Sequence, residues 1–277
     1  MFLFIPLSTF ASAGSSHGQT NLIAIGQGIS SPTLTSTVNF STGYTHESPV
    51  GVVYQNSWRL SAEYDQDNNA DSNNNNGKTG YGAELGYGTG AAGIAAGYYT
   101  RNCTGCEGRW AGSAAAVVAD IGVGLRYQKD SYTAAALFNP NGTHRVGLIA
   151  EFSSDDDNDE TNNNNGIGHS VKTYGLGYSY VGSQWTFTVD ASQRNYENPT
   201  KYSIRLLLSP GLMVRADFLQ LSLTDEITLN NRETSTSNVD DTHHELWFGV
   251  GVGDKAWHFA GYAKYVNDMA LVGSLFF

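Results

Sequence analysis

Residues 172–194 read KTYGLGYSYVGSQWTFTVDASQR, in which apolar and polar side chains alternate on both sides of a short break. Aromatic and aliphatic side chains occupy every second position, from Tyr174 before the break and from Trp185 after it. Strict alternation over about ten residues is typical of a β-strand with one apolar and one polar face. The stretch therefore predicts two antiparallel strands, 171–181 and 185–194, joined by a tight turn.

The same alternation recurs over most of the chain beyond residue 57. Only 15% of the 277 residues are charged, against about 25% in an average soluble domain, and the fine alternation reconciles this with a negative mean hydropathy. In residues 109–119, the run from Ser113 to Ala119 also fits a short helix. Fourteen strands are expected, over residues 57–66, 80–88, 91–101, 109–119, 121–128, 131–139, 143–153, 171–181, 185–194, 200–208, 211–223, 244–252, 256–265 and 268–277.

Three polar segments, residues 65–79, 153–170 and 224–244, separate some of these strands and hold half of the 26 acidic residues. The net charge of −11 excludes a general nucleic-acid binder, because no basic stripe is present. Long loops at one end and tight turns at the other are typical of outer-membrane β-barrels, in which closure leaves no free edge. We therefore predict an all-β protein of the bacterial outer membrane, a transmembrane antiparallel barrel of about fourteen strands with an N-terminal plug. Tight turns are expected at residues 88–90, 139–142, 182–184, 209–211 and 253–255.

The N-terminal residues 1–13, MFLFIPLSTFASA, are typical of a secretory signal peptide that ends in Ala-Ser-Ala before Gly14. No cation precedes Arg59, which points to a truncated signal; the alternative is a first strand of the mature fold. The expected organisation is a signal over 1–13, a plug over 14–56 and a barrel over 57–277.

Cys103 and Cys106 lie in a polar Cys-Thr-Gly-Cys turn. In an exported protein this spacing predicts a local disulfide. A redox site would need a helix N-terminus to lower the thiol pKa, and a zinc site would need more ligands nearby. No cofactor is expected.

The two faces of the predicted strands differ in character. Aromatic side chains gather at the strand ends, as in an interfacial girdle, although aromatic residues also favour strands in general. Those expected toward the outside are Tyr64, Tyr81, Tyr99, Trp110, Tyr127 and Tyr202, and those expected toward the periplasm are Phe138, Trp185 and Trp257. Charges of both signs on the opposite face either line a wet pore or cross-link a closed lumen. These lumen-facing candidates are Arg59, Glu63, Glu84, Arg126, Arg145, Glu151, Asp190, Arg194, Arg205, Arg215, Asp217 and Lys264.

Two acidic clusters invite a chemical interpretation. Asp155, Asp157 and Asp159 are weak candidates for calcium, but the Gly and spaced Glu of an EF-hand are missing. A solvated loop, bridged by divalent ions to lipopolysaccharide, is preferred, and no metal site is predicted. Residues 240–245, Asp-Asp-Thr-His-His-Glu, could bind a metal, but no matching cluster is predicted on a second strand and no nucleophile can be placed. The sequence therefore predicts no enzyme.

The C-terminus resembles the assembly signal of Gram-negative outer-membrane barrels. A terminal aromatic residue is preceded there by apolar residues at alternate positions. The matching residues are Met269, Leu271, Leu275 and Phe277. This resemblance implies insertion by the barrel-assembly machinery, with outer-membrane lipid as a further partner.

Residues 47–54, Glu-Ser-Pro-Val-Gly-Val-Val-Tyr, stand shortly before the first strand and resemble the Asn-Pro-Ala-Gly-Leu hatch motif of the long-chain fatty-acid transporter family. Ser48, Pro49, Val50 and Gly51 form the match, with Ser48 in place of Asn and Val50 in place of Ala. The resemblance implies fourteen strands around an N-terminal hatch. The chain is short for that family and its loops are acidic, so the resemblance supports the fold more than the ligand.

A weaker resemblance is to the porin-like major outer-membrane proteins of predatory bacteria, which form ring oligomers enclosing lipid. It depends on the Gly- and Ala-rich run from Gly80 to Gly124. Small residues permit close backbone approach, either at a subunit interface or against a plug.

Three functions follow from these patterns. The leading one is porin-like passive permeation by a homo-oligomer, with acidic outer loops repelling anions. The second is transport of hydrophobic compounds in the manner of the fatty-acid family. The third is a structural protein that organises lipid without an open pore.

Overall fold

The structure is a computed structural model of the chain and describes residues 28–30, 48–54, 57–67, 78–102, 108–128, 131–155, 169–198, 201–216, 219–234, 237–253, 257–264 and 268–276. Among these residues, the 3₁₀-helix η3 (Pro49–Tyr54) precedes the strands. The strands of the described residues are β1 (Trp58–Asp67), β2 (Lys78–Gly88), β3 (Ala92–Asn102), β4 (Arg109–Val118), β5 (Ile121–Gln128), β6 (Ser131–Phe138), β7 (His144–Asp155), β8 (His169–Val181), β9 (Trp185–Asn198), β10 (Lys201–Ala216), β11 (Leu219–Thr234), β12 (Ser237–Gly253), β13 (Trp257–Lys264) and β14 (Asp268–Phe276).

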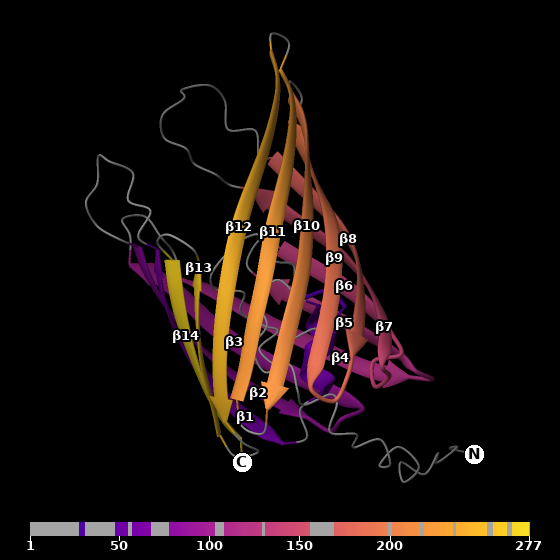
Figure 1. The fold of residues 1–277 in the computed structure, drawn as a ribbon, viewed down its shortest axis with the longest axis vertical. Coiled ribbons are helices and arrows are strands. Elements are labelled where there is room, and N and C mark those ends of the chain that lie inside the picture. Colours follow the sequence, from indigo (N-terminus) through magenta and orange to yellow (C-terminus); the bar gives the residue numbers. More distant parts are fainter. Residues whose placement is uncertain are drawn as a thin grey trace.

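Each strand pairs antiparallel with the next along the chain, and β1 pairs with both β2 and β14. The strand order therefore closes on itself around an enclosed interior (Figure 1). A closed ladder satisfies the backbone groups of its paired residues within the sheet. The all-β, antiparallel class predicted from the alternation is confirmed. Residues 109–119 contain the strand β4, so the helical alternative for this run is wrong.

The turn between β4 and β5 shows why such short connections suffice. Ala119 and Asp120 both have positive φ angles, 48° and 63°. Two consecutive residues in the left-handed region form the primed type of turn that matches the twist of a hairpin. Backbone N–H of Asn139 donates to the carbonyl of Asp120 at 2.8 Å, which ties this turn to the neighbouring one.

The predicted turn at residues 209–211 is wrong, because these residues lie inside β10. Ser209 and Pro210 pair with Asp190 and Val189 of β9, whereas pairing with β11 is interrupted there. Proline has no N–H, so it is tolerated where one ladder is already broken and does not have to end the strand.

The predicted loop at residues 224–244 is also wrong for its larger part. β11 and β12 continue through it as a hairpin that is paired as far as Thr234 and Ser237. This hairpin rises above the other strands in Figure 1. An antiparallel ladder satisfies its own backbone groups, so a polar sequence can extend as strand well beyond an apolar belt.

The outward face of the described strands is apolar. On β5, Val123 and Leu125 are exposed, whereas Gly122, Gly124 and Arg126 between them are buried. Of the predicted girdle residues, Tyr202 lies in β10 and its side chain is outside the described part. The others exposed on the outer face are Tyr81, Trp110, Tyr127, Phe138, Trp185 and Trp257, and Tyr64 and Tyr99 are half-buried. Among the described residues, no helix has the length and apolar character needed to span a membrane.

Candidate functional site

The inner face of the described strands carries polar and charged side chains. They occupy the positions that alternate with the exposed apolar residues, and they are buried although they are polar. These residues are Arg59, Ser61, Glu63, Glu84, Ser113, Arg126, Thr133, Arg145, Thr173, Ser179, Thr186, Thr188, Asp190 and Ser192. A protein that is apolar outside and polar inside has the reverse of the pattern of a soluble domain, and this reversal suits a barrel in lipid.

The structure places the predicted lumen residues as follows. Arg59, Glu63, Glu84, Arg126, Arg145 and Asp190 are buried on the inner face, and Glu151 is half-buried. Arg194 lies in β9, Arg205 and Arg215 in β10, and Lys264 in β13, with side chains outside the described part. Asp217 lies outside the described residues.

Ion pairs join strands across the inner face. Arg59 of β1 pairs with Glu84 of β2. Arg126 of β5 lies 3.8 Å from the carboxylate of Glu151 on β7 and donates to the hydroxyl of Thr133 on β6 at 3.3 Å. Because buried charges are tolerated when they are paired, these contacts hold adjacent strands in register.

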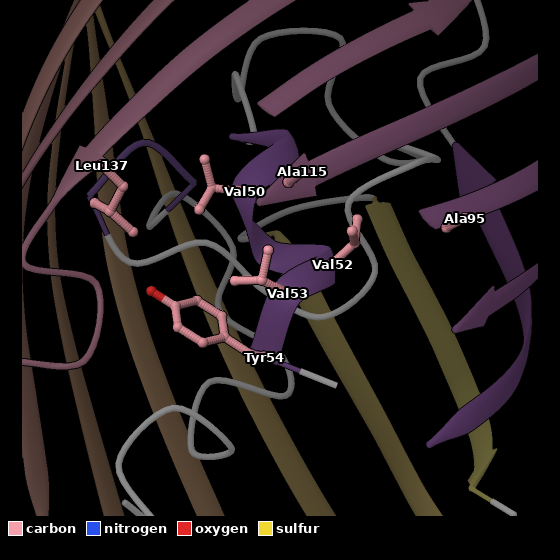
Figure 2. Packing of buried hydrophobic residues seen from close by; sticks show 7 residues of the cluster. All are labelled: Val50, Val52, Val53, Tyr54, Ala95, Ala115 and Leu137. Atoms are coloured by element: carbon pink, nitrogen blue, oxygen red, sulfur yellow. The ribbon is translucent and has the colours of Figure 1, made fainter. Parts of the chain in front are cut away.

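The segment 48–54, which includes the predicted plug motif from Ser48 to Gly51, is buried against the inner face. Its helix η3 packs against β2, β3, β4, β5 and β6. Val50, Val52 and Val53 of this segment are fully buried. Figure 2 shows them in a cluster with Tyr54 and wall residues, which are Ala95, Ala115 and Leu137. This cluster is an apolar patch on a wall that also carries buried polar and charged side chains.

Inward glycines make room for this segment. A Cβ on Gly122 would lie 2.6 Å from Cγ1 of Val50, and one on Gly124 would lie 2.9 Å from the backbone nitrogen of the same residue. A Cβ on Gly93 would collide with the carbonyl oxygen of Val52. The Gly- and Ala-rich run was compatible with a subunit interface or with packing against an inner segment. For these glycines, packing against the inner segment holds. Alanines of the same run, Ala92, Ala96 and Ala114, are exposed on the outer face.

Residues 28–30 form a second contact with the inner face, on β8 and β9. The carboxylate of Asp190 accepts hydrogen bonds from the backbone N–H of Ile29 at 2.9 Å and from the hydroxyl of Ser30 at 2.7 Å. The hydroxyl of Ser179 donates to the carbonyl of Ser30 at 2.9 Å. No local pattern indicates this anchoring role of Asp190, because its partners lie far away in the sequence.

The two segments are joined to each other directly. The backbone N–H of Ser48 donates to the carbonyl of Gly28 at 2.7 Å. We refer to residues 28–30 and 48–54 together as the inner segment.

Tyr54 ends the inner segment beside the turn that connects β6 and β7. Its hydroxyl donates to the carbonyl of Pro140 at 2.9 Å, and the guanidinium carbon of Arg145 lies 5.4 Å from its ring centroid. Burial raises the pKa of the Tyr54 phenol, and the charge of Arg145 opposes that rise. The phenol therefore stays protonated and able to donate. Arg145 in turn donates from Nε to the carbonyl of Gly142 at 3.1 Å.

The remaining predicted sites are only partly within the described residues. Leu271 and Leu275 of the predicted assembly signal are exposed on β14; Met269 lies in the same strand, and Phe277 is outside the described part. Asp155 ends β7. Cys103, Cys106, Asp157 and Asp159 lie outside the described residues. Residues 240–245 lie in β12, and their side chains are outside the described part.

No protein-family model matches the chain, and no curated protein matches it by sequence. Solved structures of similar fold include two forms of OmpT, an outer membrane protein of Vibrio cholerae. The form lacking loop L8 has 8% identity and a TM-score of 0.51, covering 79% of this chain and 97% of that one. The in-vitro folded form has 8% identity and a TM-score of 0.50, covering 79% and 96%. An anion-selective porin from Comamonas acidovorans has 10% identity and a TM-score of 0.47, covering 79% and 98%.

At these identities the likeness shows the fold alone, and the fold assignment rests on the two OmpT structures. The fold is that of an outer-membrane β-barrel protein, in agreement with the predicted location in the bacterial outer membrane. The expectation that the chain is not an enzyme is corrected by the same finding. OmpT is among the similar structures at 8% identity, and a shared fold at that identity assigns neither catalysis nor its absence.

Proposed function

We propose that this chain is an outer-membrane channel that lets small polar solutes permeate passively. Residues 57–277 form the fourteen-stranded barrel, residues 14–56 form a plug, and residues 1–13 are the export signal. The observation that carries the proposal is the polar inner face, on which Arg59, Arg126 and Asp190 are buried while the outer face is apolar. Water and solutes need such a lining, whereas a lipid-organising protein without a conduit does not.

The inner segment supports a channel that is closed at rest. Its two parts occupy the interior beside β2 to β6 and beside β8 and β9, where Asp190 and Ser179 bind residues 29 and 30. Permeation then requires that the inner segment shifts or leaves. The acidic residues in the outer segments are proposed to favour cations at the mouth, because like charges are repelled there.

Close approach of a second copy is supported by the exposed alanines of the outer face. Ala92, Ala96 and Ala114 present little side-chain bulk to the surroundings. We propose that a homo-oligomer forms on this face.

A cavity in the wall favours a second candidate function, the transport of hydrophobic compounds. It has a volume of about 460 Å³. Its lining combines membrane-facing residues, among them Leu125, Tyr127 and Phe152, with the buried Ala95, Ser113, Arg126 and Thr133. Sites for small ligands range over about 300–1,000 Å³, so the cavity has the size for one.

Planar-bilayer conductance tests the leading proposal. The full-length protein is expected to show a low conductance, and deletion of residues 14–56 is expected to produce large, steady openings. Val123→Ala, on the outer face of β5, serves as a control that should conduct like the full-length protein. If neither the full-length nor the deleted protein conducts, the channel proposal is wrong. Saturable binding of a hydrophobic dye, removed by Ala134→Trp in the wall cavity, would then favour the second candidate.

A further inference from the structure

Arg145 differs from the other arginines buried on the described inner face. Arg59 pairs with Glu84, and Arg126 lies beside Glu151. Arg145 is 1% exposed, and within the part of the chain that the structure describes its Nη1 and Nη2 atoms have no hydrogen-bond partner. A buried guanidinium remains charged, and leaving its donors unsatisfied is costly.

The contacts that Arg145 does make fix the orientation of its guanidinium. Nε donates to the carbonyl of Gly142, and the guanidinium lies over the ring of Tyr54. These two contacts use one donor and one face, and they leave the edge formed by Nη1 and Nη2. Two parallel N–H groups on a planar edge match the two oxygens of a carboxylate or a phosphate.

The inner-face position of Arg145 restricts what can supply those oxygens. Its neighbours Val146 and Leu148 show the outward direction of β7, because they are exposed while Arg145 and Gly147 are buried. A lipid headgroup outside the barrel is on the wrong side of the wall. The first 56 residues contain a single acidic residue, Glu47, so the N-terminal part of the chain offers one carboxylate at most.

We propose that the Nη1–Nη2 edge of Arg145 is a binding site for a small soluble oxyanion, a carboxylate or a phosphate, on the inner face beside the turn between β6 and β7. An anion bound there adds acceptors without displacing Tyr54 or Gly142. Because Tyr54 ends the inner segment and contacts Arg145, the bound anion also stabilises the attachment of that segment to the wall. This last consequence rests on the proposed plug function, whereas the binding site does not.

Calorimetric titration of the full-length protein tests the site. Inorganic phosphate, and separately acetate, is added in a chloride buffer with a sugar-based detergent, so that no other carboxylate or phosphate is present. Saturable binding is expected in the wild type, and Arg145→Gln should weaken it at least tenfold. Arg126→Gln removes an arginine of the same wall that has a carboxylate neighbour, and it should bind phosphate as the wild type does.

Further variants keep the test decisive. If Arg145→Gln does not fold, Arg145→Lys replaces it, since a single ammonium group lacks the planar edge and should also bind more weakly. The proposal is overturned if the wild type shows no saturable binding, or if the folded Arg145 variants bind as tightly as the wild type. It is also overturned if binding appears only in Glu47→Gln, because an internal carboxylate would then occupy the site. The calorimetric test measures anion binding and not conductance. Its result can therefore be interpreted even if the channel proposal fails.

Discussion

The hydroxyl of Ser30 donates a hydrogen bond of 2.7 Å to the carboxylate of Asp190, which lies 160 residues later in the chain. The same carboxylate accepts the backbone N–H of Ile29. One buried side chain of the wall therefore holds the first part of the inner segment by two bonds. A hydrogen bond contributes a net stabilisation of about 0.5–1.5 kcal/mol, so two of them to one side chain restrain residues 28–30 substantially.

Replacing Asp190 should release that restraint. In Asp190→Ala, we expect the amide of Ile29 to exchange with solvent at least about tenfold faster, since the loss of about 1.4 kcal/mol corresponds to a factor of ten. Hydrogen exchange measured by mass spectrometry on the folded protein gives this rate. Ser192→Ala, one inward position further along β9, is the matched control and should leave the rate unchanged. Equal protection in Asp190→Ala and the wild type would show that the carboxylate does not hold the segment.

The inward glycines that contact η3 predict that a larger side chain displaces this helix. In Gly124→Val, the added side chain meets the backbone of Pro49 and Val50, because a Cβ alone lies 2.9 Å from the nitrogen of Val50. Overpacking costs about 1–3 kcal/mol, which either destabilises the barrel or displaces η3. We expect displacement, seen as an increased conductance in planar bilayers. Val123→Ala, the outward neighbour, should conduct like the wild type, and a Gly124→Val protein that does so too would contradict the prediction.

The buried pair of Arg59 and Glu84 should be sensitive to removal of one partner. Glu84→Gln leaves a buried guanidinium without its counter-charge, and breaking a buried pair costs about 3–5 kcal/mol. The double variant Arg59→Met with Glu84→Gln removes both charges and is expected to recover part of that loss. Urea unfolding in lipid vesicles, followed by tryptophan fluorescence, compares the three proteins. If the double variant is less stable than the single one, side-chain packing rather than the unpaired charge determines the stability at this position.

The membrane-facing surface makes a prediction about Leu125, which is 65% exposed on β5. On the surface of a water-soluble protein, an exchange at such a position changes stability by no more than about 0.5 kcal/mol. On a lipid-facing strand, arginine near the bilayer centre costs about 2–4 kcal/mol. We therefore expect Leu125→Arg to lower the free energy of unfolding in vesicles by that amount, with Leu125→Ala as the control. A Leu125→Arg protein as stable as the control would place this face in water.

Alternation alone was sufficient to predict most strands, because a period of two is a local property of each segment. The turn predicted at 209–211 is wrong because proline does not always end a strand, and Pro210 is accommodated where β10 lacks pairing with β11. The loop predicted at 224–244 is wrong for its larger part because a polar composition does not exclude a paired strand. Thr228 and Leu229 instead pair with His243 and Thr242 of β12.

The contacts of the inner segment could be predicted only in part. The predicted plug motif includes Pro49 and Val50, and both are buried against the wall. The partners on the wall, such as Gly122 for Val50 and Asp190 for Ile29, depend on how strands distant in sequence are brought together. One sequence without its fold contains no local signal for such pairings.

The bond between Ser48 and Gly28 has a consequence for how the inner segment leaves the wall. It links the contact at Asp190 to the contact made by η3. While one part of the inner segment stays bound, it keeps the other part at a high effective concentration near its own binding site on the wall. Detaching one anchor alone gains little freedom, since the tethered partner promotes rapid rebinding. Departure should therefore be cooperative, with both anchors released in a single step.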